Sequence, residues 1–188
     1  MSRHQRTIKN EVSISGIGLH TGVKSTITFK PAPENSWIKF VRTDVENCPE
    51  IVADINHVTD ISRGTTLSQN GVQVHTVEHV LSAVAGLGID NIIIAINNIE
   101  PPVCDGSAIE FVRALKRAEI VEQEAEQDIL VIDKILTYSD PKKHVDIHIT
   151  PAEKFQITFL IDYSEIPAIG TQYSTTYSLE DEFETDYA

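Results

Sequence analysis

Apolar residues alternate with polar ones along the first part of the chain, which predicts extended structure. The alternation runs through 11–15 and again through 23–29, with a glycine-rich turn at 16–22 between them. A second turn, Pro31-Ala-Pro-Glu-Asn35, leads into an expected third strand over 37–41. We therefore predict that the first 45 residues form paired strands.

A helical pattern replaces this alternation after a short expected strand at 72–74, which follows the Asn70-Gly71 turn. Apolar residues then recur three and four positions apart and form one helical face. The members of this face are Val77, Val80, Leu81, Val84 and Ala85. Gly86 and Gly88 are expected to end the helix, because glycine favours the C-terminal cap.

Two further elements are expected before the acidic stretch at 119–128. The run 89–97 is rich in β-branched residues and nearly continuous in apolar character, which predicts a buried central strand. Ser107 is expected to cap a second helix. Its inward-facing side chains would be Ile109, Phe111, Val112 and Leu115. Together these elements predict an α+β domain, a sheet on helices in two layers.

The acidic stretch 119–128 itself predicts a linker, after which the earlier pattern recurs. A strand, a Pro-Ala turn and a strand occupy 25–44, and 145–162 has the same plan. This weak internal repeat stops before any helix that could cover the second sheet, which leaves half a domain. We therefore expect an N-terminal fragment of a longer two-domain protein, with the rest of the second domain following C-terminally.

Composition and charge narrow the class of protein. The 188 residues are 41% hydrophobic, as in an ordinary globular protein, with 15 basic and 28 acidic residues. No basic patch of the kind that binds nucleic acid is visible. The longest apolar run, Ile92–Ile96, is far shorter than the ~20 residues that span a bilayer, so no integral membrane segment is expected. The polar N-terminus shows no signal peptide, and we expect a cytoplasmic protein.

The most informative short motif is His75-Thr-Val-Glu-His79. A neutral imidazole is a good zinc ligand, and a neighbouring carboxylate can deprotonate a metal-bound water. The string also matches the H-x-x-E-H pattern of inverted zincins, although the third ligand that such a site needs is not found downstream. The alternative is a solvent-facing helix start in which the helix dipole favours Glu78.

Two polar loops are further candidates. Gly16-Ile-Gly-Leu-His-Thr-Gly22 leads into a strand rather than a helix, so it fails as a dinucleotide fingerprint. It is typical of a hairpin turn with His20 at its tip. Arg63, in the loop 61–66, could meet a phosphate or a carboxylate, or it could be a solvated surface residue.

These pieces, taken in order, resemble one family. The motifs are G-I-G-L-H-T-G at 16–22, P-A-P at 31–33, R-T-D at 42–44, T-V-E-H at 76–79, A-G-L-G-I-D-N at 85–91 and D-G-S at 105–107. Each motif is weak alone, but the ordered set resembles the UDP-3-O-acyl-N-acetylglucosamine deacetylase (LpxC) family of lipid A biosynthesis. The resemblance is dense over about residues 3–120 and looser beyond them.

The resemblance implies a fold and a domain organisation. It implies a tandem repeat of a ribosomal S5 domain 2-like unit, each copy a sheet packed on helices, with the active site between the two. The first LpxC-like α+β domain would occupy 1–126, and 127–188 would begin a second, incomplete one. Family members with and without a fused 3-hydroxyacyl-carrier-protein dehydratase (LpxC/FabZ type) are both compatible with these residues.

The resemblance also implies a chemistry. The family hydrolyses the N-acetyl group of a UDP-sugar that carries an acyl chain, with Zn²⁺ as cofactor. Glu78 matches the general base, and His79 matches one zinc ligand. His20 and Arg63 match residues near the substrate. The other ligands, a His and an Asp of an H-K-x-x-D motif, are expected beyond residue 188, so the isolated chain is expected to be inactive.

Two alternatives remain open. One is an inverzincin-like metallopeptidase that uses His75, Glu78 and His79, which the resemblance disfavours because the family does not require a His at position 75. The other is a non-catalytic UDP-sugar-binding domain that keeps the fold without the chemistry. Loss of peptidase activity on His75→Ala would favour the first. Tight UDP-sugar binding without hydrolysis would favour the second.

Overall fold

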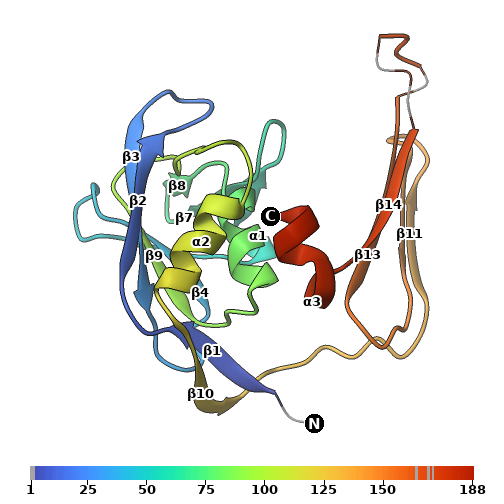
Figure 1. Ribbon diagram of the computed structural model, residues 1–188. Coiled ribbons are helices and arrows are strands. Elements are labelled where there is room, and N and C mark those ends of the chain that lie inside the picture. Colours follow the sequence, from blue (N-terminus) through green and yellow to red (C-terminus); the bar gives the residue numbers. More distant parts are fainter. Residues whose placement is uncertain (1–2, 164, 169, 171) are drawn as a thin grey trace. The chain divides into compact units, whose positions relative to one another are not determined.

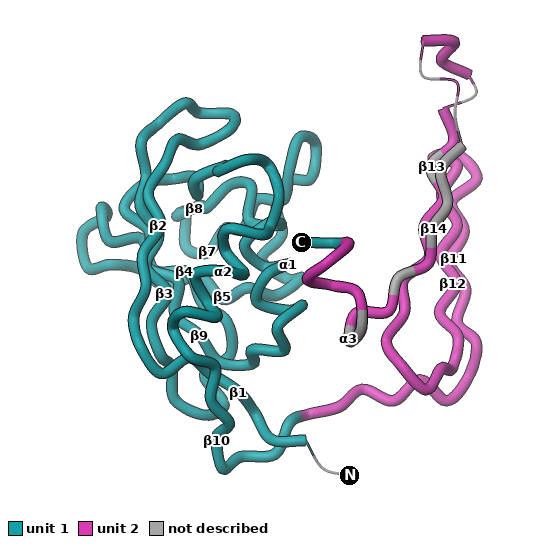
Figure 2. The backbone as a smooth tube through the Cα atoms, viewed as in Figure 1, with its two compact units in different colours: residues 1–127, 187–188 teal, residues 128–186 magenta. Residues whose placement is uncertain are grey.

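The computed structural model describes residues 3–163, 165–168, 170 and 172–188. The chain divides into two compact units, one made of residues 1–127 and 187–188 and the other of residues 128–186 (Figure 2). Among the described residues, no helix is long and apolar enough to cross a bilayer.

A five-stranded sheet forms the framework of the first unit. Its strand order is β2-β3-β9-β4-β5, so β9 is the central strand, as the apolar run predicted. β9 pairs antiparallel with β3 and parallel with β4. The bounds are Val12–Ile17 for β2, Lys24–Pro31 for β3, Ile92–Ile96 for β9, Ile38–Arg42 for β4 and Glu50–Val52 for β5.

Two helices pack against one face of this sheet (Figure 1). α1 spans Glu78–Gly86 and α2 spans Ile109–Arg117, close to the predicted helices. The Phe29 ring of β3 meets the Phe111 ring of α2 edge to face, with centroids 6.5 Å apart. The three valines of the predicted apolar face of α1 are buried, but Leu81 is half-buried, Ala85 is exposed, and Ala83 is buried instead. The first unit has a mixed α+β fold with its core between sheet and helices.

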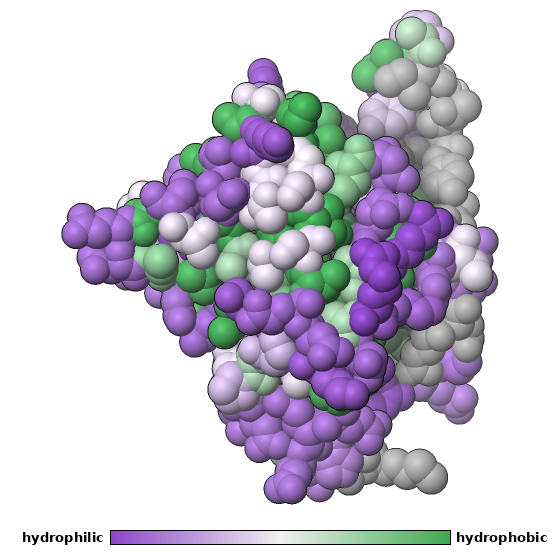
Figure 3. Space-filling model, turned by 60° about the vertical axis from the view of Figure 1, so that its left-hand side comes forward, coloured by the Kyte–Doolittle hydropathy of each residue, from purple (hydrophilic) through white to green (hydrophobic). Residues whose placement is uncertain are grey.

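The opposite face of the sheet is weakly polar. Ser13 and Ser15 of β2 form hydrogen bonds with Thr28 and Thr26 of β3, at oxygen–oxygen distances of 2.8 and 2.7 Å. Figure 3 shows pale, weakly polar side chains on the face turned toward the viewer, with hydrophobic ones between them and strongly hydrophilic ones around them. Only one face of the sheet therefore needs a helical cover, which gives two layers.

The start of α2 differs in detail from the prediction. Ala108, not Ser107, is the N-cap residue, and no side chain caps the helix there. The Ser107 hydroxyl instead accepts a hydrogen bond from the Ile109 N–H at 3.3 Å, and both the hydroxyl and the N–H of Ser107 donate to Asp105. Asp105 and Ser107 thus close the turn that precedes the helix.

The acidic stretch 119–128 was predicted to be a linker, and this prediction is wrong. Its larger part forms strand β10 (Ile120–Glu126), which pairs antiparallel with β1 (His4–Ile8). The three glutamates of β10 are exposed, while the residues between them are half-buried. The high charge concealed a period-two pattern, because every carboxylate lies on the solvent side of the strand.

A buried amide joins this pair of strands to the sheet. The Asn91 side chain is fully buried, and its Oδ1 accepts hydrogen bonds from the N–H groups of Ser36 and Trp37 at 3.0 and 2.9 Å. Its Nδ2 donates to Gln5 of β1 and to Gln123 of β10, each at 2.8 Å. Asn91 therefore satisfies partners from three segments that are distant in sequence.

Replacing Asn91 by Ala is expected to lower the free energy of unfolding by about 1–3 kcal/mol, because it leaves buried donors and acceptors without partners. Denaturant titration followed by circular dichroism measures this loss. Asn10→Ala is the matched control, because the Asn10 side chain is exposed and its hydrogen bonds are long, at 3.5 Å. Equal stability of the two variants would contradict the role given to Asn91.

A small sheet leads the chain into α1. Its strands are β6 (Val58–Asp60), β7 (Thr66–Gln69) and β8 (Val72–Val74), paired in that order, with a 3₁₀ turn at Ile55–His57 before them. The Asn70-Gly71 turn joins β7 to β8 as predicted. This sheet fixes where the polar loop 61–65 and the segment 75–77 lie.

The second unit contains two separate strand pairs. β11 (Leu136–Asp140) pairs antiparallel with β12 (Val145–Ile149), and β13 (Gln156–Asp162) pairs antiparallel with β14 (Gln172–Ser178). The short helix α3 (Leu179–Glu182) and a π-helical turn (Phe183–Tyr187) follow. The predicted strands within 145–162 are thus confirmed, whereas β11 and β14 were not predicted.

Candidate functional site

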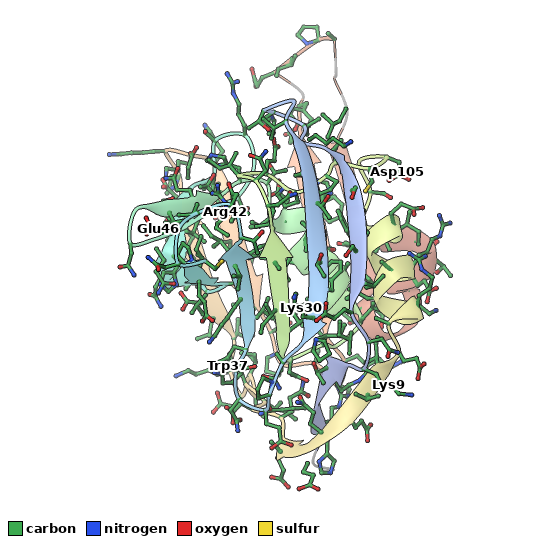
Figure 4. All side chains as sticks on the ribbon, turned by 90° about the vertical axis from the view of Figure 1, so that its left-hand side faces the viewer. Lys9, Lys30, Trp37, Arg42, Glu46 and Asp105 are labelled. Carbon is green, nitrogen blue, oxygen red and sulfur yellow. The ribbon has the colours of Figure 1, made fainter. Side chains whose placement is uncertain are left out.

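Loops from distant parts of the sequence meet at one end of the five-stranded sheet. Because β2, β9 and β4 end where β3 begins, the loops at 18–23, 97–107 and 43–49 share this end. Figure 4 shows Arg42 and Asp105 at this end of the sheet, and Trp37 and Lys9 toward the other. The candidate site residues gather around these loops.

Glu78 and His79 are the first two residues of α1, and both are half-buried. The Glu78 Oε2 accepts a hydrogen bond from the Thr65 N–H at 2.8 Å, which holds the carboxylate beside the loop 61–65. His79 lines a small hollow together with apolar side chains that include Leu19 and Val103. Adjacent residues therefore carry a carboxylate and an imidazole at the positive end of the helix dipole.

His75 does not lie on this helix. The backbone of Thr76 has a φ of +53°, in the left-handed region, so the right-handed helix cannot extend back to His75. The His75 Nδ1 forms a hydrogen bond with the Thr66 hydroxyl at 2.9 Å. The two histidines are thus not one turn apart on a single helix, as the inverted zincin pattern requires.

A polar cavity of about 240 Å³ lies next to the start of α1. It is lined by His20 and Arg63, which the sequence singled out, together with Asp60 and His75. Thr76 lines both this cavity and the hollow beside His79, so the two adjoin. The structure thereby brings His20 and Arg63 into one cavity at the helix start that bears Glu78 and His79.

Sequence reasoning missed Glu100, whose side chain is completely buried. Its Oε1 accepts hydrogen bonds from the His20 N–H at 3.0 Å and from the Thr76 hydroxyl at 2.9 Å. Its Oε2 accepts from the Thr21 N–H at 2.9 Å and from the Thr21 hydroxyl at 2.6 Å. The available signal was a lone acidic residue between an apolar strand and Pro101-Pro102.

The carboxylate of Glu100 stays charged despite its burial. Burial alone would raise its pKa, but the hydrogen bonds from the Thr21 hydroxyl and from the His20, Thr21 and Thr76 donors outweigh that effect and lower the pKa to about 2. Because this value is below the ordinary 4.5, the stability that the charge contributes is complete above about pH 4.5 and is lost as the pH falls toward 2.

The side chains present do not by themselves complete a zinc site. Catalytic zinc normally has three protein ligands. Within the ranges that the structure describes, no group of three or more His, Cys, Asp or Glu side chains is placed to hold a metal ion. His79 can supply one imidazole, and the donor set of residues 3–188, apart from the three positions left undescribed, stops short of three ligands.

These features define an α+β domain with a carboxylate–imidazole pair at a helix start beside a polar cavity. Residues 5–188 match the family described as UDP-3-O-acyl N-acetylglycosamine deacetylase, LpxC. The chain belongs to this family, so the resemblance seen in the sequence is confirmed.

Several relatives share this similarity along nearly the whole chain. The bifunctional enzyme LpxC/FabZ of Chlorobaculum tepidum is 50% identical over 98% of this chain and 39% of the relative. The protein of the same name from Bacteroides thetaiotaomicron is 42% identical over 91% of this chain and 37% of its own length. The UDP-3-O-acyl-N-acetylglucosamine deacetylase of Myxococcus xanthus is 42% identical over 91% of this chain and 54% of its own length. The chain thus spans about half or less of these relatives.

Proposed function

We propose that this chain is part of a zinc-dependent deacetylase that removes the N-acetyl group of UDP-3-O-acyl-N-acetylglucosamine in lipid A biosynthesis. The observation that carries the proposal is the Glu78–His79 pair at the start of α1, in a chain that belongs to the LpxC family. Such an enzyme acts on a UDP-sugar with an acyl chain, and we place it in the cytoplasm.

Glu78 is the general base of this proposal. Its carboxylate takes a proton from the water that attacks the acetamide carbonyl carbon, and the C–N bond then breaks as the leaving amine gains a proton. The Thr65 N–H fixes one carboxylate oxygen of Glu78 at 2.8 Å. The carboxylate is thereby oriented before substrate binds, which lowers the entropic cost of proton transfer.

His79 is the proposed zinc ligand of this chain. Bound zinc would supply a Lewis acid that polarises the acetamide carbonyl. Since residues 3–188, as far as they are described, hold no group of three ligands, we propose that the others come from the rest of the full-length protein. The coverage of 54% or less of the three named relatives supports this proposal.

His20 and Arg63 are the proposed substrate-binding residues. Both line the 240 Å³ cavity, and the Arg63 side chain is exposed there without an ion pair among the described residues. A guanidinium group suits the phosphate oxygens of a UDP-sugar because it presents several donors in one plane. This placement supports a role in binding rather than in the bond-breaking step.

The domain organisation is also a proposal. We assign 1–126 to the first of two S5 domain 2-like units and 127–188 to the beginning of the second. In the first unit, β9 lies between β3 and β4. β12 and β13, which follow the same strand–Pro-Ala–strand plan, have no strand between them among the described residues. A strand equivalent to β9, supplied by the full-length protein, would fill that position.

Backbone amides of β12 and β13 are therefore expected to exchange hydrogen more slowly in the full-length protein than in the 188-residue chain, because an inserted strand pairs with them. Hydrogen exchange with mass spectrometry measures the difference. The β3 and β9 amides are the internal control, since their pairing is complete in this chain. Equal exchange of β12 and β13 in both proteins would contradict the inserted strand.

Acetate release from UDP-3-O-acyl-N-acetylglucosamine by the full-length protein tests the proposed function. A metallopeptidase is disfavoured because His75 is off the helix and bound to Thr66. A non-catalytic domain would bind the UDP-sugar tightly and release no acetate. Substrate turnover that a chelator abolishes and added zinc restores is the expected result.

A further inference from the structure

Glu100 is a buried anion that is compensated by neutral donors alone. No ion pair involves Glu100 among the residues that the structure describes, and its partners are the backbone N–H groups of His20 and Thr21 and the hydroxyls of Thr21 and Thr76. A buried carboxylate is costly unless hydrogen bonds satisfy it. The donors must therefore keep their positions around it for the charge to be tolerated.

These donors belong to two segments that are far apart in the sequence. His20 and Thr21 lie in the turn between β2 and β3, and Thr76 lies two residues before Glu78. The residue before Glu100 also contacts the segment that contains Thr76, because the Ile99 carbonyl accepts a hydrogen bond from the His75 N–H at 2.9 Å. The chain that leaves β9 thus contacts both segments at consecutive residues.

The turn is fitted closely around the carboxylate. A Cβ atom at Gly18 would overlap Glu100 Oε2 and would lie 2.7 Å from the Thr21 hydroxyl oxygen, so only glycine leaves room there. One residue after Glu100, the chain passes Pro101-Pro102, and a Cβ at Gly16 would lie 2.9 Å from the Pro102 Cβ. The turn has little freedom to move while Glu100 holds it.

We propose that Glu100 is a positioning residue of the active site, which ties the turn bearing His20 to the segment that leads Glu78 and His79 into α1. Glu100 is fully buried and its hydrogen-bond partners are His20, Thr21 and Thr76, so it acts through these residues rather than on the reacting groups. It sets the distance between the substrate-binding side and the catalytic side of the site. This role rests on the proposed deacetylase function for its effect on turnover, but the tie itself is a property of the fold.

Glu100→Gln in the full-length, zinc-loaded protein tests the tie. Glutamine keeps the shape of the side chain, but it has one acceptor oxygen, and its NH₂ group faces donors. We expect kcat for acetate release to fall at least tenfold with zinc content unchanged, at a temperature well below the unfolding midpoint. We also expect the His20 and Thr21 amides to exchange hydrogen at least tenfold faster.

The control variant is Glu122→Gln, which removes an exposed carboxylate from β10. The proposal would be overturned if Glu100→Gln itself had a kcat within twofold of the parent and unchanged hydrogen exchange of the His20 and Thr21 amides. If the parent protein releases no acetate, the proposed function fails, and amide exchange still decides whether Glu100 positions the turn.

A second pair of variants applies if Glu100→Gln does not fold. Thr76→Val replaces the hydroxyl that donates to Glu100 by a methyl group, whereas Thr76→Ser keeps a donor. We expect Thr76→Ser to retain at least fivefold more activity than Thr76→Val and to exchange the His20 amide more slowly. Equal activity and equal exchange in the two variants would show that the hydroxyl–carboxylate contact does not position the site.

Discussion

Replacing Glu78 by Gln in the full-length protein is expected to lower kcat for acetate release by roughly 10²–10⁴-fold, the usual contribution of a general base. Glutamine can still accept the Thr65 N–H hydrogen bond through its amide oxygen, so the side chain keeps its anchor at the start of α1. What it cannot do is take a proton from water at neutral pH. The loss should therefore appear in kcat, with KM nearly unchanged.

Steady-state kinetics, zinc analysis and thermal unfolding together measure this prediction. Zinc content and the unfolding midpoint should match those of the parent, because neither the imidazole of His79 nor the core is altered. Glu124→Gln, an exposed carboxylate on β10, is the control for a generic loss of charge. Turnover in Glu78→Gln within a few-fold of the parent would assign the base to another residue.

The elements that could be predicted from the sequence each show a pattern of apolar residues within one short segment. The alternation of β2 and β3, the apolar face of α1 and the continuous apolar run of β9 each express burial within one short segment. Such periodicity is visible without knowledge of the rest of the chain. The central position of β9 followed as well, because a nearly continuous apolar run is typical of a strand in the buried middle of a sheet.

One missed element, β10, depends on a partner far away in sequence. β10 became a strand because β1, more than one hundred residues earlier, pairs with it, and its exposed glutamates hid the pattern. The helix start was placed correctly, but the break before it rests on one backbone angle, the φ of +53° at Thr76. No composition rule predicts that angle, so the i, i+4 spacing of His75 and His79 was misleading.

The same dependence on distant partners explains which residues of the candidate site could be predicted from the sequence. Glu78, His79, His20 and Arg63 could be proposed because motifs carry them, and the cavity then placed His20 and Arg63 together. Glu100 stood in no motif that had been given a chemical role. Its partners lie 24, 79 and 80 residues away, so its importance depends on the meeting of loops at one end of the sheet.

Replacing His79 by Ala in the full-length protein is expected to remove zinc and turnover together. Losing an outer-shell partner typically weakens metal binding by roughly 10–100-fold, and losing a direct ligand should exceed that. Zinc content after dialysis against a weak chelator measures the effect, with His4→Ala, an exposed histidine on β1, as the control. Stoichiometric zinc in His79→Ala would exclude His79 as a ligand.

The 188-residue chain provides the complementary measurement. It carries the His79 imidazole, but its described residues hold no group of three ligands, so we expect it to retain little zinc under the same conditions. Retained, stoichiometric zinc would require a complete site within these residues. That site would have to recruit His75 away from Thr66, which a test of His75→Ala in the same chain would reveal. Loss of zinc in the short chain and retention in the full-length protein would instead place the missing ligands in the remainder of the protein.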